Sequence, residues 1–123
     1  MKLFESITLL LIGLIHFLPL LGVMGVKQLK TLYGVDLTDS SVILLMRHRA
    51  VLFGIVGGLI MYSVFFPTLL AVAYIVGAIS MASFVVLALP IKNHTPALKK
   101  VFYIDMIGLI MLLVSCLGAT FFS

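Results

Sequence analysis

The chain has 123 residues, of which 63% are hydrophobic and 10% charged, and its formal net charge is +4. A soluble domain has about half apolar and a quarter charged residues, and one of this size cannot hide so much apolar surface from water. The composition argues against a soluble protein, and the basic residues lie at the ends of apolar segments rather than in a nucleic-acid-binding patch. We therefore expect an integral membrane protein whose partner is the lipid bilayer, with no nucleic acid.

Four apolar segments reach the length of about 20 residues that a helix needs to cross a bilayer. They cover residues 3–26, 42–66, 69–89 and 98–122 of a single transmembrane domain, residues 1–123. The first segment is longer than the apolar part of a signal peptide and has no A-x-A cleavage site, so we expect it to be retained. The sequence thus predicts an all-α fold, an integral membrane antiparallel four-helix bundle.

Three residues interrupt the first segment. Glu5 is expected near one membrane surface as a solvated carboxylate, whereas His16 is expected near the middle of the bilayer. Pro19 frees backbone carbonyls and is expected to kink the helix. For His16, a neutral ring bonded to a neighbouring backbone or hydroxyl group and a member of a polar site are both open alternatives.

The connection at residues 27–41 contains a short amphipathic pattern. Apolar residues recur there at helical spacing: Val26, Leu29, Leu32 and Tyr33. With Lys27 and Lys30 between them, the pattern predicts a short helix at the level of the lipid head groups. Gly34 is expected to end this helix, and Asp39 is a typical N-cap for the next one.

The second segment carries a face of small residues, Ala50, Gly54, Gly57 and Gly58. Such a face predicts close helix packing, which we expect within the bundle, with a second copy of the chain as the alternative. At about 100° per residue, Arg47 projects toward this face, whereas His48 and Arg49 point away from it. We expect Arg49 to extend toward cytoplasmic head groups.

Asp105 in the fourth segment is expected at the same depth as Arg47, which predicts an ion pair between the two. An alternative is a polar pocket that opens to the cytoplasm and holds an anionic group on the arginine. The residues proposed for this pocket or ion pair are Arg47, Asp105, His16, Tyr103 and His48.

No motif for catalysis, for a cofactor or for a metal is present. The chain lacks a phosphate-binding loop, a nucleophile elbow and an H-E-x-x-H pair, and its single cysteine, Cys116, cannot form an internal disulfide. We therefore predict no catalytic residue, no metal and no cofactor. This argues against an enzyme without excluding one that acts through scattered residues.

The basic residues predict the orientation in the membrane. Lys27, Lys30, Lys92, Lys99 and Lys100 fall on one side of the four segments, and Lys2 falls on the other. Loops rich in lysine and arginine face the cytoplasm. Both termini are therefore expected outside, on the periplasmic side if the membrane is the inner membrane of a bacterium.

Residues 32–36 (LYGVD) and 45–54 (LMRHRAVLFG) resemble small four-helix bacterial membrane proteins of the DoxX-like kind. In these proteins a YG loop leads into a span that opens with an arginine and continues with a glycine-rich face. The resemblance implies a multi-pass protein of the bacterial inner membrane. Some members resemble subunits of quinone-linked oxidoreductases, which implies a possible accessory role.

Three functions are compatible with these features. The first is a non-catalytic accessory subunit or an oligomeric component, alone as a homo-oligomer or within a larger membrane complex. The second is a binder or carrier of a small anionic or amphipathic ligand, such as a lipid or a quinone. The third is a subunit of a membrane oxidoreductase.

Overall fold

The computed structural model describes the backbone of residues 2–91 and 94–122 and the side chains of residues 3–91 and 94–118. Over these residues the chain is helical and has no strand, which confirms the all-α prediction. Among them, four helical segments are long and apolar enough to cross a membrane: Leu3–Met24, Ser40–Ser63, Pro67–Ala88 and Pro96–Gly118. Lys92 and the side chain of Lys2, used above to predict the orientation, lie outside the described residues.

The first long segment changes helix type at its proline. The α-helix α1 (Lys2–Phe17) is followed by the 3-10 helix η1 (Leu18–Met24), with Pro19 in the first turn of η1. A proline has no N–H to bond the carbonyl four residues before it, and its ring collides with that carbonyl. The sequence predicted a kink at Pro19, and the structure has a switch from α to 3-10 geometry there.

Two glycines bound the short helix α2 (Val26–Tyr33). Gly25 before it has φ 127° and Gly34 after it has φ 67°, conformations that residues with a side chain rarely adopt. The N–H of Gly34 donates to the carbonyl of Lys30 at 2.7 Å and closes the helix. Leu29 and Tyr33 are buried on its inner side, so the predicted amphipathic helix and its end at Gly34 are confirmed.

The remaining helices begin at side-chain caps or prolines. In α3 (Ser40–Ser63), the Asp39 carboxylate accepts from the N–H of Ser41 at 2.8 Å, so Asp39 is the predicted N-cap. This helix ends at residue 63 rather than 66, because Phe66 precedes Pro67 and is pushed out of the helical conformation. The other elements are η2 (Pro67–Leu69), α4 (Leu70–Ala88) and α5 (Pro96–Phe122).

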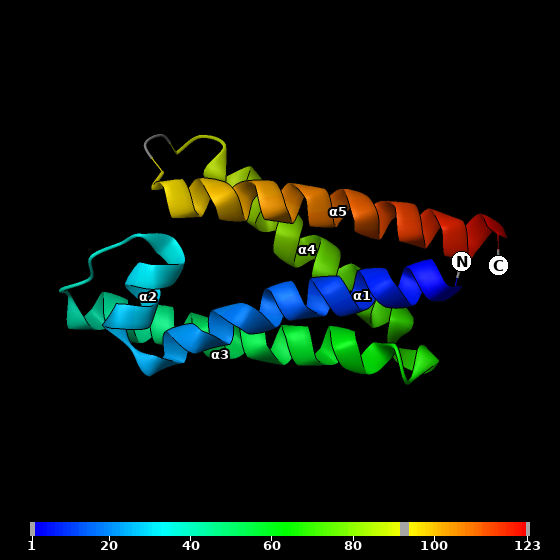
Figure 1. Ribbon diagram of the computed structural model, residues 1–123, viewed down its shortest axis with the longest axis horizontal. Helices are drawn as coiled ribbons and strands as arrows, with labels where there is room; N and C mark the ends of the chain where they lie inside the picture. Colours follow the sequence, from blue (N-terminus) through cyan, green and yellow to red (C-terminus); the bar gives the residue numbers. More distant parts are fainter. Residues whose placement is uncertain (1, 92–93, 123) are drawn as a thin grey trace.

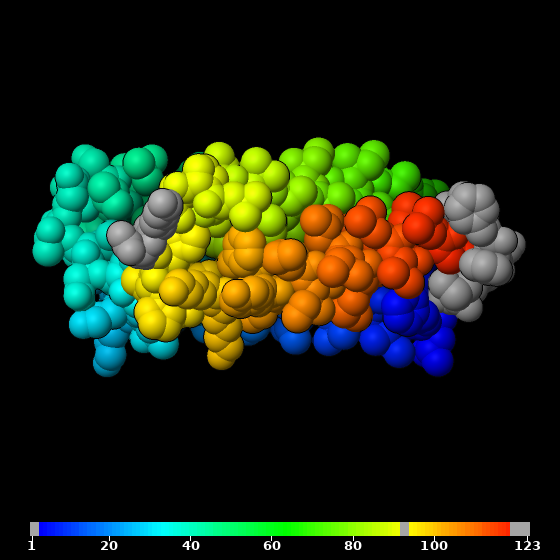
Figure 2. All heavy atoms as spheres, turned by 90° about the horizontal axis from the view of Figure 1, so that it is seen from above, coloured from blue at the N-terminus to red at the C-terminus, as the bar shows by residue number. Residues whose placement is uncertain are grey.

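The small-residue face of α3 packs against α1 and η1. A Cβ on Gly57 would lie 2.6 Å from the carbonyl oxygen of Gly13 and 2.7 Å from the nitrogen of Phe17, so only a glycine fits. Figure 1 shows α1 beside α3, and α4 and α5 run side by side along the face seen in Figure 2. The glycine face is thus used within the molecule, against α1 and η1.

A small core joins all four long segments, and apolar side chains also cover the outside. The core consists of Leu9, Ile12, Ile60, Ala73, Met81 and Leu112. Large apolar side chains on the outer faces are mostly exposed, for example Leu44 (68%), Leu87 (68%) and Ile110 (58%). An apolar exterior of this extent is what a lipid environment accommodates and water does not.

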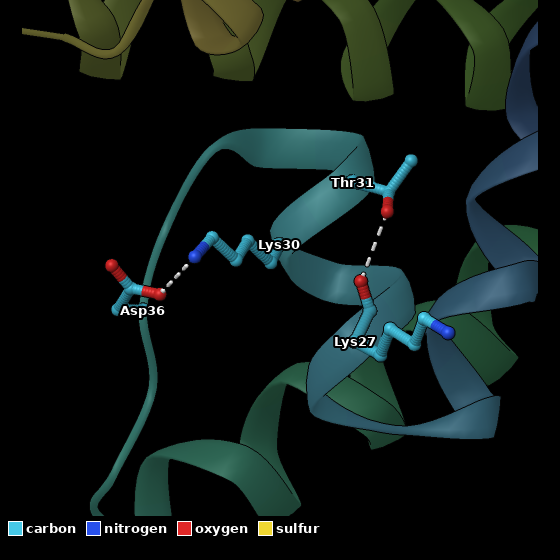
Figure 3. A network of polar contacts seen from close by, with 4 residues as sticks. All are labelled: Lys27, Lys30, Thr31 and Asp36. Carbon is cyan, nitrogen blue, oxygen red and sulfur yellow. Dashed lines mark hydrogen bonds and ion pairs between the residues drawn. The ribbon is translucent and has the colours of Figure 1, made fainter.

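The start of α1 and the end of α5 lie at one end of the molecule, and α2 lies at the other (Figure 1). At the α2 end, Lys30 forms an exposed ion pair with Asp36 at 3.0 Å, and the hydroxyl of Thr31 donates to the carbonyl of Lys27 at 3.0 Å (Figure 3). The ion pair joins α2 to the loop that follows it, and the hydrogen bond lies within α2.

Candidate functional site

A cavity of about 400 Å³ lies at the α2 end between α1, η1, α2, α3 and α5. Most of its wall is apolar and includes Ile15, Leu18, Leu32, Phe53, Val101 and Ile104. Six polar or charged side chains also line it: His16, Thr31, Tyr33, Arg49, Lys100 and Asp105. An apolar cavity with a few convergent polar groups is the usual form of a small-molecule site. We call this cavity the Arg49 pocket.

Arg49 is held by aromatic neighbours on two sides. Its Nη1 donates to the hydroxyl of Tyr33 at 2.9 Å, and its Cζ lies 4.4 Å from the ring centre of Phe53 and 5.3 Å from that of Tyr33. A guanidinium has five N–H donors, and Arg49 uses one of them on the described residues. The others remain for a ligand or water, so the side chain is fixed in place and still able to bind.

Asp105 and Lys100 both come from α5. Asp105 is half-buried, whereas Lys100 is the exposed one of the two; we call the exposed side of the pocket next to Lys100 its mouth. The positive charge of Arg49 acts on the Asp105 carboxylate. Among the residues that the structure describes, however, none makes a hydrogen bond or ion pair with Asp105.

His16 is buried in the pocket wall with both ring nitrogens engaged. Its Nδ1 lies 2.8 Å from the carbonyl oxygen of Ile12, which can only accept, so Nδ1 carries the hydrogen. In the neutral ring, Nε2 then accepts from the hydroxyl of Ser80 at 2.8 Å. Of the two alternatives for His16, the neutral ring bonded to backbone and hydroxyl groups fits this geometry, and it links α1 to α4.

The predicted Arg47–Asp105 ion pair is wrong. The Nε of Arg47 donates to the carbonyl of Val23 at 2.7 Å, and Arg47 lines a separate outer hollow of about 370 Å³ together with His48. The glycine face of α3 packs on α1 and η1. Because Arg47 lies next to this face, it contacts the end of η1 and not Asp105 of α5. The neighbouring Arg49, expected to extend to head groups, faces Asp105 instead.

Tyr103 also lies outside the Arg49 pocket. Its side chain is 63% exposed, and its ring makes an edge contact with Phe102 at 5.6 Å between centres. Of the five predicted residues, the structure therefore brings only His16 and Asp105 into the pocket.

Sequence reasoning missed Arg49, Tyr33, Phe53 and Lys100 as pocket residues. One signal was available, because Arg49 and Phe53 are four residues apart and share one face of a helix. An arginine stacked on a ring at this spacing is held without an acidic partner. No local pattern placed Tyr33 or Lys100 beside them, since α2 and α5 are brought to α3 only by the fold.

A second polar cluster lies at the opposite end of the molecule. The Tyr74 hydroxyl donates to Oε2 of Glu5 at 2.6 Å and lies 2.7 Å from the hydroxyl of Ser115. Because Tyr74 has one hydrogen and gives it to the carboxylate, Ser115 donates to Tyr74. These residues come from α1, α4 and α5. Glu5 is thus a half-buried, hydrogen-bonded carboxylate and not the solvated one expected.

Comparison of the chain with protein-family models, with curated proteins and with solved structures finds no match. The DoxX-like resemblance therefore stays a prediction. The interpretation of the Arg49 pocket rests on its own geometry, namely an apolar cavity, a fixed arginine with spare donors and a half-buried carboxylate.

Proposed function

We propose that this chain is an integral membrane protein, an antiparallel four-helix bundle, that binds or carries a small amphipathic ligand in the Arg49 pocket. The observation that carries the proposal is the arginine itself. Its guanidinium is fixed by Tyr33 and Phe53 and has donors to spare inside a largely apolar cavity. Arginine suits phosphate and carboxylate groups because its planar fork matches their oxygens.

The size and lining of the pocket suit a ligand with an apolar body and an anionic group. A volume of about 400 Å³ is at the small end of the range typical for ligand sites. Lys100, exposed at the edge of the lining, adds a second cation, which favours a lipid-like molecule with an anionic group over an uncharged quinone. The apolar wall receives the chain of such a ligand, and Arg49 receives its phosphate or carboxylate.

The proposal includes the orientation and the membrane. Lys27, Lys30, Lys99 and Lys100 all belong to the α2 end, which supports a cytoplasmic position for this end and an outer, periplasmic position for both termini. The bacterial inner membrane follows from the DoxX-like resemblance alone. In this orientation the mouth of the Arg49 pocket faces the cytoplasmic head groups.

The two other functions stay predictions: a non-catalytic accessory or oligomeric component, and a subunit of a membrane oxidoreductase. The glycine face does not support a contact between copies, because Gly54 and Gly57 are buried against η1 and α1. Neither function explains why an arginine with spare donors lines a cavity.

The test compares two arginines of the same helix. The protein is purified in a non-ionic detergent and examined by native mass spectrometry for a bound lipid-sized molecule, as wild type, Arg49→Ala and Arg47→Ala. We expect the wild type and Arg47→Ala to carry the ligand and Arg49→Ala to lose it about tenfold or more, because each charge-assisted hydrogen bond contributes about 1.5–3 kcal/mol. Both substitutions remove one positive charge from α3, so Arg47→Ala controls for net charge.

Two results contradict the proposal. One is a wild-type chain that carries no ligand and takes up no added short-chain phospholipid. The other is a ligand that is retained equally by Arg49→Ala and Arg47→Ala. A co-purified protein or a stable oligomer in the same spectra would favour the accessory function instead.

A further inference from the structure

Asp105 sets the Arg49 pocket apart from a simple anion site. A site built only for a phosphate or carboxylate has cations and N–H donors, and a carboxylate in it repels the ligand. Asp105 lines the pocket all the same, half-buried and without a hydrogen bond or ion pair to any residue that the structure describes. The nearest arginine gives its hydrogen bond to Tyr33 rather than to Asp105.

The charges in the pocket are also spread in space. Lys100 and Asp105 are five residues apart on α5, so Asp105 lies about 7–8 Å farther along the helix than the lysine at the mouth. Arg49 comes from α3 on another wall. A ligand in the cavity therefore meets cations at Arg49 and Lys100 and an acceptor at Asp105.

We propose that the ligand is a zwitterion, in which a phosphate or carboxylate binds Arg49 and an ammonium group binds Asp105. This rests on the proposed function and names the charge pattern of its ligand. The head group of an ethanolamine phospholipid has this chemistry, and so does free phosphoethanolamine. A ligand ammonium supplies the hydrogen-bonding partner that Asp105 does not have among the described residues, and a half-buried carboxylate in a largely apolar site is costly without one.

The ammonium is the deciding group when two lipids share the same phosphate and chains. The attraction of Arg49 and Lys100 for the phosphate is then common to both and cancels in the comparison. The difference in binding free energy between the two lipids then has two parts. The attraction of the ammonium to Asp105 favours the ethanolamine lipid, and its repulsion by Arg49 and Lys100 opposes it. Lys100 is exposed and screened, and the charge of Arg49 is offset by the phosphate that it binds, so the contact with Asp105 dominates.

The experiment uses the full chain in a non-ionic detergent and isothermal titration with short-chain phospholipids. The probes are dihexanoyl phosphatidylethanolamine, its N-acetylated form and dihexanoyl phosphatidylglycerol. We expect the wild type to bind the ethanolamine lipid about tenfold more tightly than either of the other two, which lack the ammonium. Arg47→Ala, outside the pocket, should keep this preference.

The variants separate the two charges of the ligand. Asp105→Asn should reduce the preference for the ethanolamine lipid to within about twofold, without weakening the glycerol lipid, because the amide keeps the shape and removes the charge. Arg49→Ala should weaken all three probes about tenfold. Free phosphoethanolamine then identifies the source of the head group: binding close to that of the lipid indicates a water-soluble zwitterion, and much weaker binding indicates a lipid.

The inference is overturned if the wild type binds the glycerol or N-acetylated lipid as tightly as the ethanolamine lipid, or if Asp105→Asn keeps the full preference. The wild-type comparison needs no variant, so it decides the matter even if Asp105→Asn does not fold. If Arg49→Ala still weakens every probe, the proposed function stands and only the zwitterion is excluded. If no probe binds or Arg49→Ala changes nothing, the proposed function itself fails.

Discussion

Two polar regions of this molecule each contain a carboxylate and a tyrosine, but they differ in how many of the polar groups are hydrogen-bonded within the protein. At the end where α1 begins, Glu5, Tyr74 and Ser115 form a chain of hydrogen bonds between three helices. At the α2 end, most donors of Arg49 and both oxygens of the Asp105 carboxylate make no hydrogen bond to a residue that the structure describes. Each region has one acidic side chain, yet among the described residues only Glu5 is hydrogen-bonded.

The difference teaches how to separate structural from functional polar groups in an apolar protein. A polar group between helices stabilises the fold when its bonds are made within the protein. A group that stays unpaired beside a cavity destabilises the empty protein and gains a partner when a ligand binds. By this criterion His16, with both nitrogens bonded, belongs with Glu5 although it lines the pocket.

The largest effect is expected at the helix contact that supports both regions. Gly57→Ala should lower the free energy of unfolding by about 3 kcal/mol, because the new Cβ meets backbone atoms of α1 that cannot move aside alone. Helix α1 carries Glu5 at one region and His16 at the other, so both should be disturbed. Unfolding of the purified protein in detergent measures the change.

The matched control is Gly58→Ala, one residue along the same helix. A Cβ there has nothing within 4 Å, so we expect no loss of stability and a gain of up to about 1 kcal/mol from helix propensity. Equal losses for the two variants would mean that α1 does not approach α3 as closely as described.

A smaller loss of stability is expected at the region of Glu5, and it should leave ligand binding at the Arg49 pocket unchanged. Tyr74→Phe removes the hydrogen bond to Glu5 and leaves Ser115 without its acceptor, which should cost about 1–2 kcal/mol of unfolding free energy. Binding of a short-chain phospholipid at the other end should be unchanged. Tyr103→Phe, at an exposed ring, controls for loss of a hydroxyl and should change neither quantity. If Tyr74→Phe weakens the probe as much as Arg49→Ala, the two regions are not separate.

The smallest effect is expected on the outside of the pocket wall. The Lys30–Asp36 pair has 63% and 79% exposed side chains, so Lys30→Ala should change stability by less than about 0.5 kcal/mol, and less still in high salt. Probe binding should also stay the same, since α2 is anchored by buried Leu29 and Tyr33. A loss well above 1 kcal/mol would show instead that the ion pair holds α2 in place.

Features that depend on neighbours along the chain were predictable from the sequence. The cap at Asp39 and the end of α2 at Gly34 each follow from the chemistry of one residue and the few around it, whereas at Pro19 the sequence predicted a kink and the structure has a change of helix type. The four long apolar segments were also visible, because length and hydropathy alone define them.

The site was only partly predictable, because it depends on which helices become neighbours. The sequence showed that Arg47 shares the glycine face of α3, but not that this face packs on α1. Because the partner of this face was unknown, Arg47 rather than Arg49 was assigned to Asp105. The contact of Tyr74 with Glu5 spans 69 positions and has no local signal at all.

One hydroxyl has a consequence for the order in which the protein is made. Thr95 donates to the carbonyl of Tyr33 and accepts the N–H of Leu98 at 3.2 Å, so the same oxygen holds the end of α2 and starts α5. A ribosome delivers α1 to α4 before α5, and α5 supplies Lys100 and Asp105. The pocket is therefore completed only after α5 has emerged, and a bound ligand would mark chains whose synthesis has passed that point.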